Sequence, residues 1–361
     1  MQTQHPVIKR GGLYWDRDAL PPAIFSNRLK TIQRTIAEAG DDAWLMYGDA
    51  QRYGPVAYVG HFLPRTRSVL VLVPRSGQPV MLASVGPRDV PAAKTLTAIE
   101  DVRPFTQLPR EAIRLLMEQR LGQAKVGLVG ARGQLSAAEW QAISSELPEI
   151  DWRQRDDVFN RLRAAKEPAE QAMIRKAHEV VQTGLDVAGT TLKPGATLRE
   201  ALAAADKAMR QAGAEDVRLL VGVGGGSLRP PSDATISPSQ SLSLLAAAEV
   251  QRYWAEAART YGASAALADQ AVDAMVATAK PGANAGAVAD AARAVLSSAT
   301  GWTDTTADAY GLGHGIGLDA DEPPVIRASS SETLVAGAAL ALHVVLPGSI
   351  AGRTVIVGGN A

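Results

Sequence analysis

The sequence contains no cysteine, which excludes disulfide bonds, thiolate metal ligands and cysteine nucleophiles. It also lacks an excess of either charge, because 37 Lys and Arg residues balance 37 Asp and Glu residues. This balance argues against the basic surface typical of nucleic-acid or anionic-lipid binding. Histidine is scarce, with five residues in the chain. A metal site must therefore combine very few imidazoles with Asp or Glu side chains.

Long hydrophobic runs are absent as well. No segment approaches the roughly 20 apolar residues that a membrane-spanning helix needs, and the first residues lack the apolar core of a signal peptide. Hydrophobic residues make up 46% of the chain and charged residues 20%, a composition typical of globular proteins. These observations predict a soluble cytoplasmic protein with no membrane partner. A length of 361 residues favours two domains, at about 150 residues each.

The first half of the chain alternates between strand-like and helical patterns, which predicts an α/β domain. The charged stretch 150–157 is the predicted boundary, so the domains are expected at 1–157 and 158–361. Buried strands are predicted at 43–47, 68–74, 79–83 and 125–129, and helices at 25–39 and 136–146.

The second half contains an internal echo. The tetrapeptide Lys-Pro-Gly-Ala occurs at 193–196 and again at 280–283. Each copy ends an Ala-rich helical stretch, since proline lacks a backbone donor and glycine permits positive φ. A second helical stretch and a glycine-rich segment follow each copy. Two similar halves predict a pseudo-two-fold domain with a site between them.

Three segments carry a family resemblance. The segment 313–324, GHGIGLDADEPP, resembles the GHGIGL…HEPP signature of the pita-bread superfamily of creatinase, prolidase, aminopeptidase P and methionine aminopeptidase. The segment 253–261 resembles the family's GY..D..RTF strand, and 337–345 resembles its GM...IEP strand. The resemblance implies an α/β (α+β) fold, in which a creatinase-type N-terminal domain precedes a pseudo-two-fold pita-bread domain, and a homodimer.

The glycine-rich segment 313–317 could also be interpreted as a nucleotide-binding loop, but we reject this interpretation. A dinucleotide loop opens a helix whose N-terminus meets phosphate. Here Pro323 and Pro324 follow the glycines and make a helix unfavourable. No nucleotide cofactor is expected.

The chain departs from the family at its metal ligands. Family peptidases hold two metals with two Asp, one His and two Glu, and the resemblance places these positions on Leu245, Glu256, His314, His343 and Gly352. Three donors remain, namely Glu256, His314 and His343. Two imidazoles and a carboxylate can bind a single Fe(II), Mn(II) or Zn(II) ion and leave positions open. The alternative for His343 is a packing role in an apolar strand.

Further catalytic candidates follow from the resemblance. The family's proton-shuttling histidine falls on Asp321, a candidate acid or base, with turn capping as the alternative. A second family histidine, the general base of creatinase, falls on Arg229 or Leu228. Arg229 is a candidate to hold an anionic substrate group, with a solvated loop charge as the alternative. Glu322 is a catalytic candidate, and the alternative for it is a structural role that holds its loop in place.

Candidate substrate-binding residues are Tyr253, Arg259 and Tyr310, beside the metal positions in sequence. For the aromatic residues, core packing is the alternative. His61 is a candidate to reach the site of a partner subunit, because family N-terminal domains often close over the partner's pocket.

Three functions are compatible with these residues, and each takes a small-molecule ligand or a peptide. The first is a mononuclear metal hydrolase acting on a C–N bond, which the ancestry favours. The second is a non-haem Fe(II) oxygenase, which the ligand types favour. The third is a metal-free pseudoenzyme that binds a peptide or small ligand. A standard dinuclear Xaa-Pro peptidase is not expected, because two of five ligands are missing.

Overall fold

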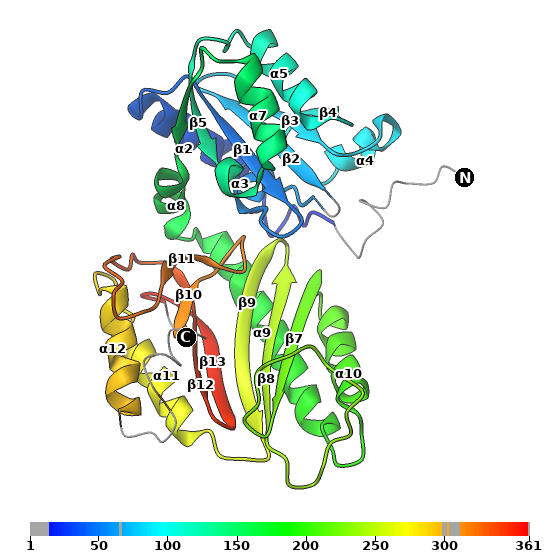
Figure 1. The fold of residues 1–361 in the computed structure, drawn as a ribbon, viewed down its shortest axis with the longest axis vertical. Helices are drawn as coiled ribbons and strands as arrows, with labels where there is room; N and C mark the ends of the chain where they lie inside the picture. Colours follow the sequence, from blue (N-terminus) through cyan, green and yellow to red (C-terminus); the bar gives the residue numbers. More distant parts are fainter. Residues whose placement is uncertain (1–13, 65–66, 298–301, 303–310, 360–361) are drawn as a thin grey trace. The chain divides into compact units, whose positions relative to one another are not determined.

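The computed structural model of the protein describes residues 14–64, 67–297, 302 and 311–359. The chain divides into two compact units between Arg163 and Ala164 (Figure 1). The predicted boundary, after residue 157, lies inside helix α8, Asp156–Ala164. In the part of the chain that the structure describes, no helix is long and apolar enough to cross a membrane.

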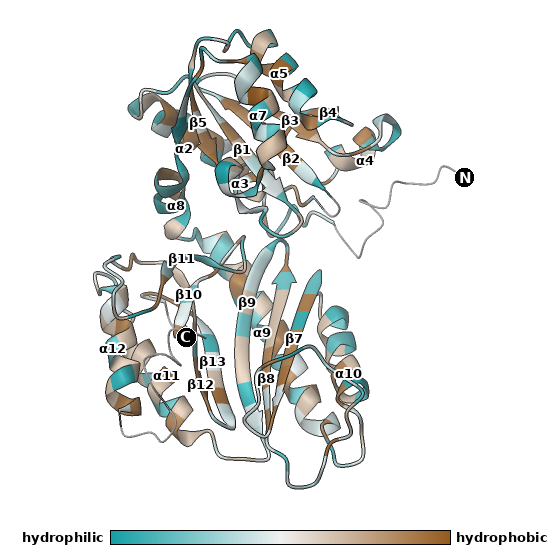
Figure 2. Cartoon of the chain, in the orientation of Figure 1, coloured by the Kyte–Doolittle hydropathy of each residue, from teal (hydrophilic) through white to brown (hydrophobic). Residues whose placement is uncertain are grey.

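Unit 1 is built on a six-stranded sheet with the order β4-β3-β2-β1-β5-β6. Its central strands are almost wholly apolar and buried, since helices cover them (Figure 2). The strands are β1 (Ala43–Asp49), β2 (Ser68–Pro74), β3 (Val80–Ala83), β4 (Asp101–Pro104), β5 (Lys125–Val129) and β6 (Asp151–Gln154). The helices before α8 are α2 (Pro22–Glu38), α3 (Gly54–Gly60), α4 (Val90–Lys94), α5 (Leu108–Glu118), α6 (Ala131–Gln134) and α7 (Ala137–Glu146).

Unit 2 contains a seven-stranded sheet with the order β11-β10-β12-β13-β9-β8-β7. Its strands are β7 (Asp216–Val223), β8 (Leu242–Val250), β9 (Tyr253–Tyr261), β10 (Gly313–Gly315), β11 (Glu322–Val325), β12 (Ala339–Leu346) and β13 (Ser349–Ile356). Its helices are α9 (Pro168–Thr191), α10 (Leu198–Gln211), α11 (Ala266–Thr278) and α12 (Ala285–Leu296). The mixed α/β fold confirms the predicted fold class.

The sequence echo corresponds to a structural repeat. The C-cap residues of α9 and α11, Leu192 and Ala279, have identical backbone angles of φ −72° and ψ 73°. Gly195 and Gly282 follow with φ of +91° and +86°, a region that favours glycine. The order β7-β8-β9 in one half of the sheet mirrors β10-β12-β13 in the other. The pseudo-two-fold axis therefore passes between β9 and β13, where Gly352 pairs with Ala258.

One face of this sheet is covered by helices and the other carries the candidate site. Apolar side chains at even positions of β8 pack with α9 and α10, and those of β12 pack with α11 and α12. Figure 1 shows α9 behind β8 and β9. Because strand side chains alternate between faces, odd positions of β8 and β12 face away from these helices. Their cross-strand partners, at even positions of β7, β9, β10 and β13, do the same.

A buried carboxylate fixes the turn of the β8–β9 hairpin. The two turn residues, Gln251 and Arg252, have φ of +49° and +71°, values that side chains disfavour. Glu215, which is 5% exposed, accepts bonds from the Arg252 Nη1 at 2.7 Å and the Arg252 backbone N–H at 3.2 Å. This anchor holds the register of β9, which carries Glu256.

We expect Glu215→Gln to lower the free energy of unfolding of unit 2 by about 2 to 4 kcal/mol, because it leaves a buried guanidinium without its counter-charge. Urea unfolding measures the effect. Asp233→Asn, which breaks the exposed pair with Arg199, is the control and should cause no measurable change. Equal stability of Glu215→Gln and wild type would contradict this role.

Unit 1 has its own buried anchor, Asp41, which is fully buried. Burial alone would raise the pKa of this carboxyl group. Bonds from the Arg155 Nε at 2.6 Å and the Trp44 Nε1 at 2.9 Å outweigh that effect and lower the pKa below its ordinary value of 3.8.

The lowered pKa predicts a contribution to stability that is present above about pH 4 and is lost as pH falls through the folded-state pKa. Asp41→Asn removes the titrating group, so the free energy of unfolding of unit 1 should fall at neutral pH and depend less on pH in the acid range. Urea unfolding of both proteins at a series of pH values tests this. Parallel pH curves would contradict it.

Candidate metal centre

Three donors predicted from the sequence meet on the open face of unit 2. Glu256 lies on β9, His314 on β10 and His343 on β12, and one ligand atom from each lies within 4.8 Å of the other two. The Glu256 Oε1 is 3.2 Å from the His343 Nδ1 and 3.7 Å from the His314 Nε2. Ligand bonds of about 2.0 to 2.2 Å place neighbouring donors roughly 3 to 3.5 Å apart, so this spacing suits a shared ion.

Glu256 is held and ionised by its neighbours. Its backbone N–H donates to the Thr354 Oγ1 at 2.9 Å, and the same hydroxyl donates to the Glu256 carbonyl at 2.8 Å. Burial would raise the pKa of the Glu256 carboxyl group. The hydrogen bond from His343 and the positive charges of His343, His314 and Arg218 outweigh burial and hold this pKa below its usual range. A carboxylate is the form that binds a cation.

His314 is oriented as metal-binding histidines usually are. Its Nδ1 lies 2.9 Å from the Gly315 carbonyl oxygen, which can only accept a hydrogen bond. Nδ1 therefore donates to this carbonyl, and Nε2 faces Glu256. Metal-binding histidines typically donate their second nitrogen to a carbonyl in this way. The donor set and this orientation fit a divalent metal.

The two lost family positions lie on the same face as the donors. Cross-strand pairing runs from Leu245 through Ala258 and Gly352 to His343. At Gly352 an added Cβ would lie 2.9 Å from the His343 Cβ and 3.0 Å from the Leu342 carbonyl oxygen. The neighbouring position on this face of β13, Thr354, is also not an acid. Neither of the two lost positions therefore offers a carboxylate.

The predicted acid–base and anion-binding residues are not in this cluster. Asp321 and Arg229 are exposed, and neither belongs to the group of converging ligand atoms. Both roles stay predictions. Glu322 is buried, and its carboxylate accepts bonds from the Lys166 Nζ at 2.7 Å and the Asp319 backbone N–H at 3.1 Å. These contacts are those of a loop anchor, the alternative weighed for it.

The structure does not bring Tyr253 and Arg259 to the centre. Both occupy odd positions of β9, so they point toward the helices, because side chains alternate along a strand. The Tyr253 hydroxyl donates to Glu170 at 3.2 Å, and the Arg259 guanidinium contacts Asp186 at 2.7 Å. These contacts correct the prediction that the two residues line the substrate site.

The remaining two candidates lie elsewhere. His61 is in unit 1 and 1% exposed, with its ring 5.6 Å from Trp15 and 5.5 Å from Phe25 between centroids. This packing is that of a core aromatic residue rather than of one that reaches outward. Tyr310 lies outside the described residues.

Sequence reasoning missed Arg218 as a residue of this face. Its Cζ lies 4.3 Å from the centroid of the Trp254 ring, and its charge is one cause of the low pKa of Glu256. Strand alternation in 216–223 was the available signal.

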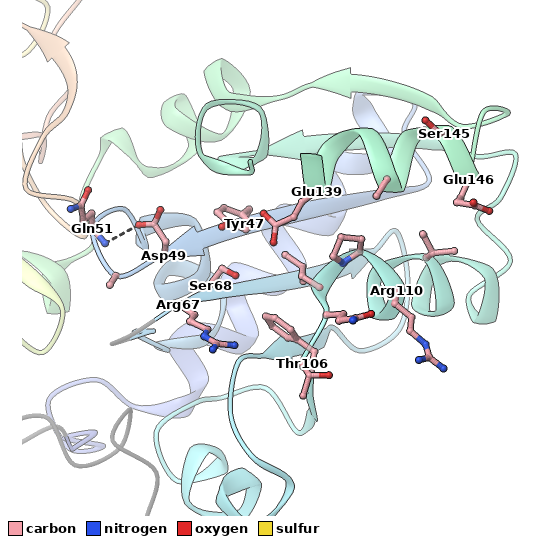
Figure 3. Close-up of a pocket in the computed structure, with 17 residues that line it drawn as sticks. Tyr47, Asp49, Gln51, Arg67, Ser68, Thr106, Arg110, Glu139, Ser145 and Glu146 are labelled. Carbon is pink, nitrogen blue, oxygen red and sulfur yellow. Dashed lines mark hydrogen bonds between the residues drawn. The ribbon is translucent and has the colours of Figure 1, made fainter. Parts of the chain in front are cut away.

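A separate cavity of about 1080 Å³ lies in unit 1, at the ends of β1 and β2 beside α5 and α7 (Figure 3). Its lining includes Tyr47, Ser68, Arg110 and Glu139, which Figure 3 labels. No predicted site residue lines it. Its lining mixes acids and bases, and its described residues form no cluster of converging metal-ligand atoms.

The chain belongs to metallopeptidase family M24, whose model matches residues 172–357. The family resemblance drawn from the sequence is thereby confirmed. No curated protein matches the chain.

Solved structures show the same fold over both units. The X-Pro aminopeptidase of Thermotoga maritima matches with 19% identity and a TM-score of 0.77, over 91% of this chain and 94% of that one. The prolidase of Pyrococcus horikoshii matches with 21% identity and a TM-score of 0.76, over 93% and 96%. The dipeptidase PepE of Mycobacterium ulcerans matches with 22% identity and a TM-score of 0.75, over 97% and 96%.

The close contact at Gly352 yields a prediction. Gly352→Ala should lower the free energy of unfolding by about 1 to 3 kcal/mol, because the new methyl group displaces the His343 strand. Gly133→Ala is the control, since a Cβ there meets no atom within 4 Å. Urea unfolding measures both, and a Gly352→Ala variant as stable as wild type would contradict the contact.

Proposed function

We propose that this chain is a metal-dependent hydrolase that holds one divalent ion on Glu256, His314 and His343 and cleaves a C–N bond in a small molecule. The convergence of these three donors on one face of the unit 2 sheet is the observation that carries the proposal. Membership of the metallopeptidase family supports hydrolysis as the reaction class.

A single ion follows from the composition of the site. Glu256 is a carboxylate, the His314 ring presents Nε2 toward it, and the His343 Nδ1 lies 3.2 Å from it. The family holds its second ion with acids at the positions of Leu245 and Gly352, and neither residue has a side-chain ligand atom. The names of the similar structures describe peptidases that act on dipeptides or X-Pro peptides. We expect the substrate of this chain to contain an amide bond, as the substrates that these names describe do.

The residues of this chain supply the positioning. A bound Zn(II) or Mn(II) ion would polarise a carbonyl group and lower the pKa of a water molecule at the site. Thr354 fixes the backbone of Glu256 by two hydrogen bonds. The Gly315 carbonyl fixes the proton of His314 on Nδ1. Asp321 remains the candidate proton donor or acceptor.

A non-haem Fe(II) oxygenase is the second candidate. Two histidines and one carboxylate with open positions are the ligand set of that class. The same three residues would hold Fe(II), so the two candidates differ in the metal and in the co-substrate, oxygen or water.

Metal content tests the proposal most simply. Anaerobically purified chain loaded with Zn(II), Mn(II) or Fe(II) should retain about one ion, and His343→Ala should weaken binding more than about 100-fold, because it removes a direct ligand. Leu245→Ala is the matched control on the same face and should leave metal affinity unchanged. Titration calorimetry and elemental analysis measure both quantities.

Turnover then divides the candidates. A hydrolase releases amine from a panel of dipeptides and N-acyl amino acids, and Glu256→Gln abolishes the release. Metal-dependent oxygen consumption without amine release would select the oxygenase. Two ions per chain, or no ion in a chain that binds peptide, would overturn the mononuclear proposal.

A further inference from the structure

Arg218 faces the candidate metal centre from the opposite half of the sheet. It lies on β7 and pairs with Ala247 of β8, which in turn pairs with Glu256 of β9. Paired residues share a face, so Arg218 and Glu256 lie on the same side, two strands apart. At about 4.8 Å per strand their Cα atoms are roughly 10 Å apart. Only the methyl group of Ala247 stands between them in this row.

Arg218 and His314 lie on corresponding strands, β7 and β10, of the two halves of the sheet. His314 on β10 pairs with Ala341 of β12, just as Arg218 on β7 pairs with Ala247 of β8. The order of the strands is mirrored about the β9–β13 pair. Strand β7 therefore contributes a guanidinium to this face, whereas the corresponding strand β10 contributes a candidate metal ligand.

Trp254 supports the guanidinium without neutralising it. The Arg218 Cζ lies 4.3 Å from the Trp254 ring centroid, within cation–π range. Trp254 is 2% exposed, so it is a fixed platform, whereas Arg218 is exposed. Among the residues that the structure describes, no acid lies within ion-pair distance of Arg218. A stacked guanidinium keeps its in-plane donors available for a planar anion.

The cross-strand row of residues next to the one that contains Arg218 is apolar. Leu220 pairs with Leu245, and Leu245 pairs with Ala258, on the same face as the centre. Leu220 and Leu245 are only half-buried. An apolar strip thus lies beside the path from the guanidinium to the three donors.

We propose that Arg218 binds a carboxylate group of the substrate, while Leu220 and Leu245 contact the apolar part that joins this carboxylate to the bond cleaved near Glu256. The inference rests on the proposed function and names its substrate class, a small apolar molecule with one terminal carboxylate. Arg218 replaces Arg229, which the sequence suggested for this role.

The surroundings favour a carboxylate over a phosphate. Asp216 and Glu249 pair with each other in the row on the other side of Arg218. Two acids beside a single guanidinium repel a dianion more strongly than a monoanion.

The test uses the full chain after removal of metal, with 4-methylpentanoate as the probe in ligand-observed NMR titrations. Arg218→Gln should weaken binding about tenfold or more, Arg218→Lys less than Arg218→Gln, and the neutral probe 4-methylpentanamide should bind wild type as weakly as the acid binds Arg218→Gln. Arg175→Gln, an exposed α9 position, is the matched control and should bind the acid normally. Leu245→Ala should weaken binding of 4-methylpentanoate but not of acetate.

Equal affinity of Arg218→Gln and wild type for the acid would overturn the proposal, and tighter binding of methyl phosphate than of the acid would overturn the choice of carboxylate. Measuring the metal content distinguishes a failure of the carboxylate site from a failure of the proposed function. Arg218→Gln should retain the wild-type number of ions. A chain that binds the acid through Arg218 but holds no metal would refute the hydrolase and leave the carboxylate site standing.

Discussion

The pairing of β9 with β13 is the constraint on which the candidate centre depends. It joins the two halves of the unit 2 sheet, with Gly352 opposite Ala258. Through this seam Glu256 from the first half meets His314 and His343 from the second. A shift of one residue in register would turn Glu256 toward the helices, because strand side chains alternate. The buried Glu215 that fixes the β8–β9 turn therefore acts on the site from a distance.

Much of the fold could be predicted from the sequence. The apolar runs that predicted strands at 68–74 and 125–129 are β2 and β5, and the repeated Lys-Pro-Gly-Ala segments end α9 and α11. These signals are local, since proline and glycine end helices and continuous apolar runs form buried strands. The three candidate metal ligands were also found, because each lies on a motif position.

The residues proposed to bind the substrate could not be predicted in the same way. Tyr253 and Arg259 are near Glu256 in sequence, but their odd positions in β9 place them on the helix face. Arg218 is far from Glu256 in sequence and reaches its face only through the pairing of three strands. Which charges converge on a sheet face depends on register and strand order, and neither is visible in a single segment.

The two halves of the repeat have thus taken different chemistry, with nitrogen donors in one and a guanidinium and leucines in the other. The most direct test is the anomalous diffraction of a crystal of the zinc-loaded chain. The account predicts one zinc peak within bonding distance of Glu256, His314 and His343, and none beside Leu245 and Gly352. Two peaks on this face, or a single peak away from those three residues, would contradict it.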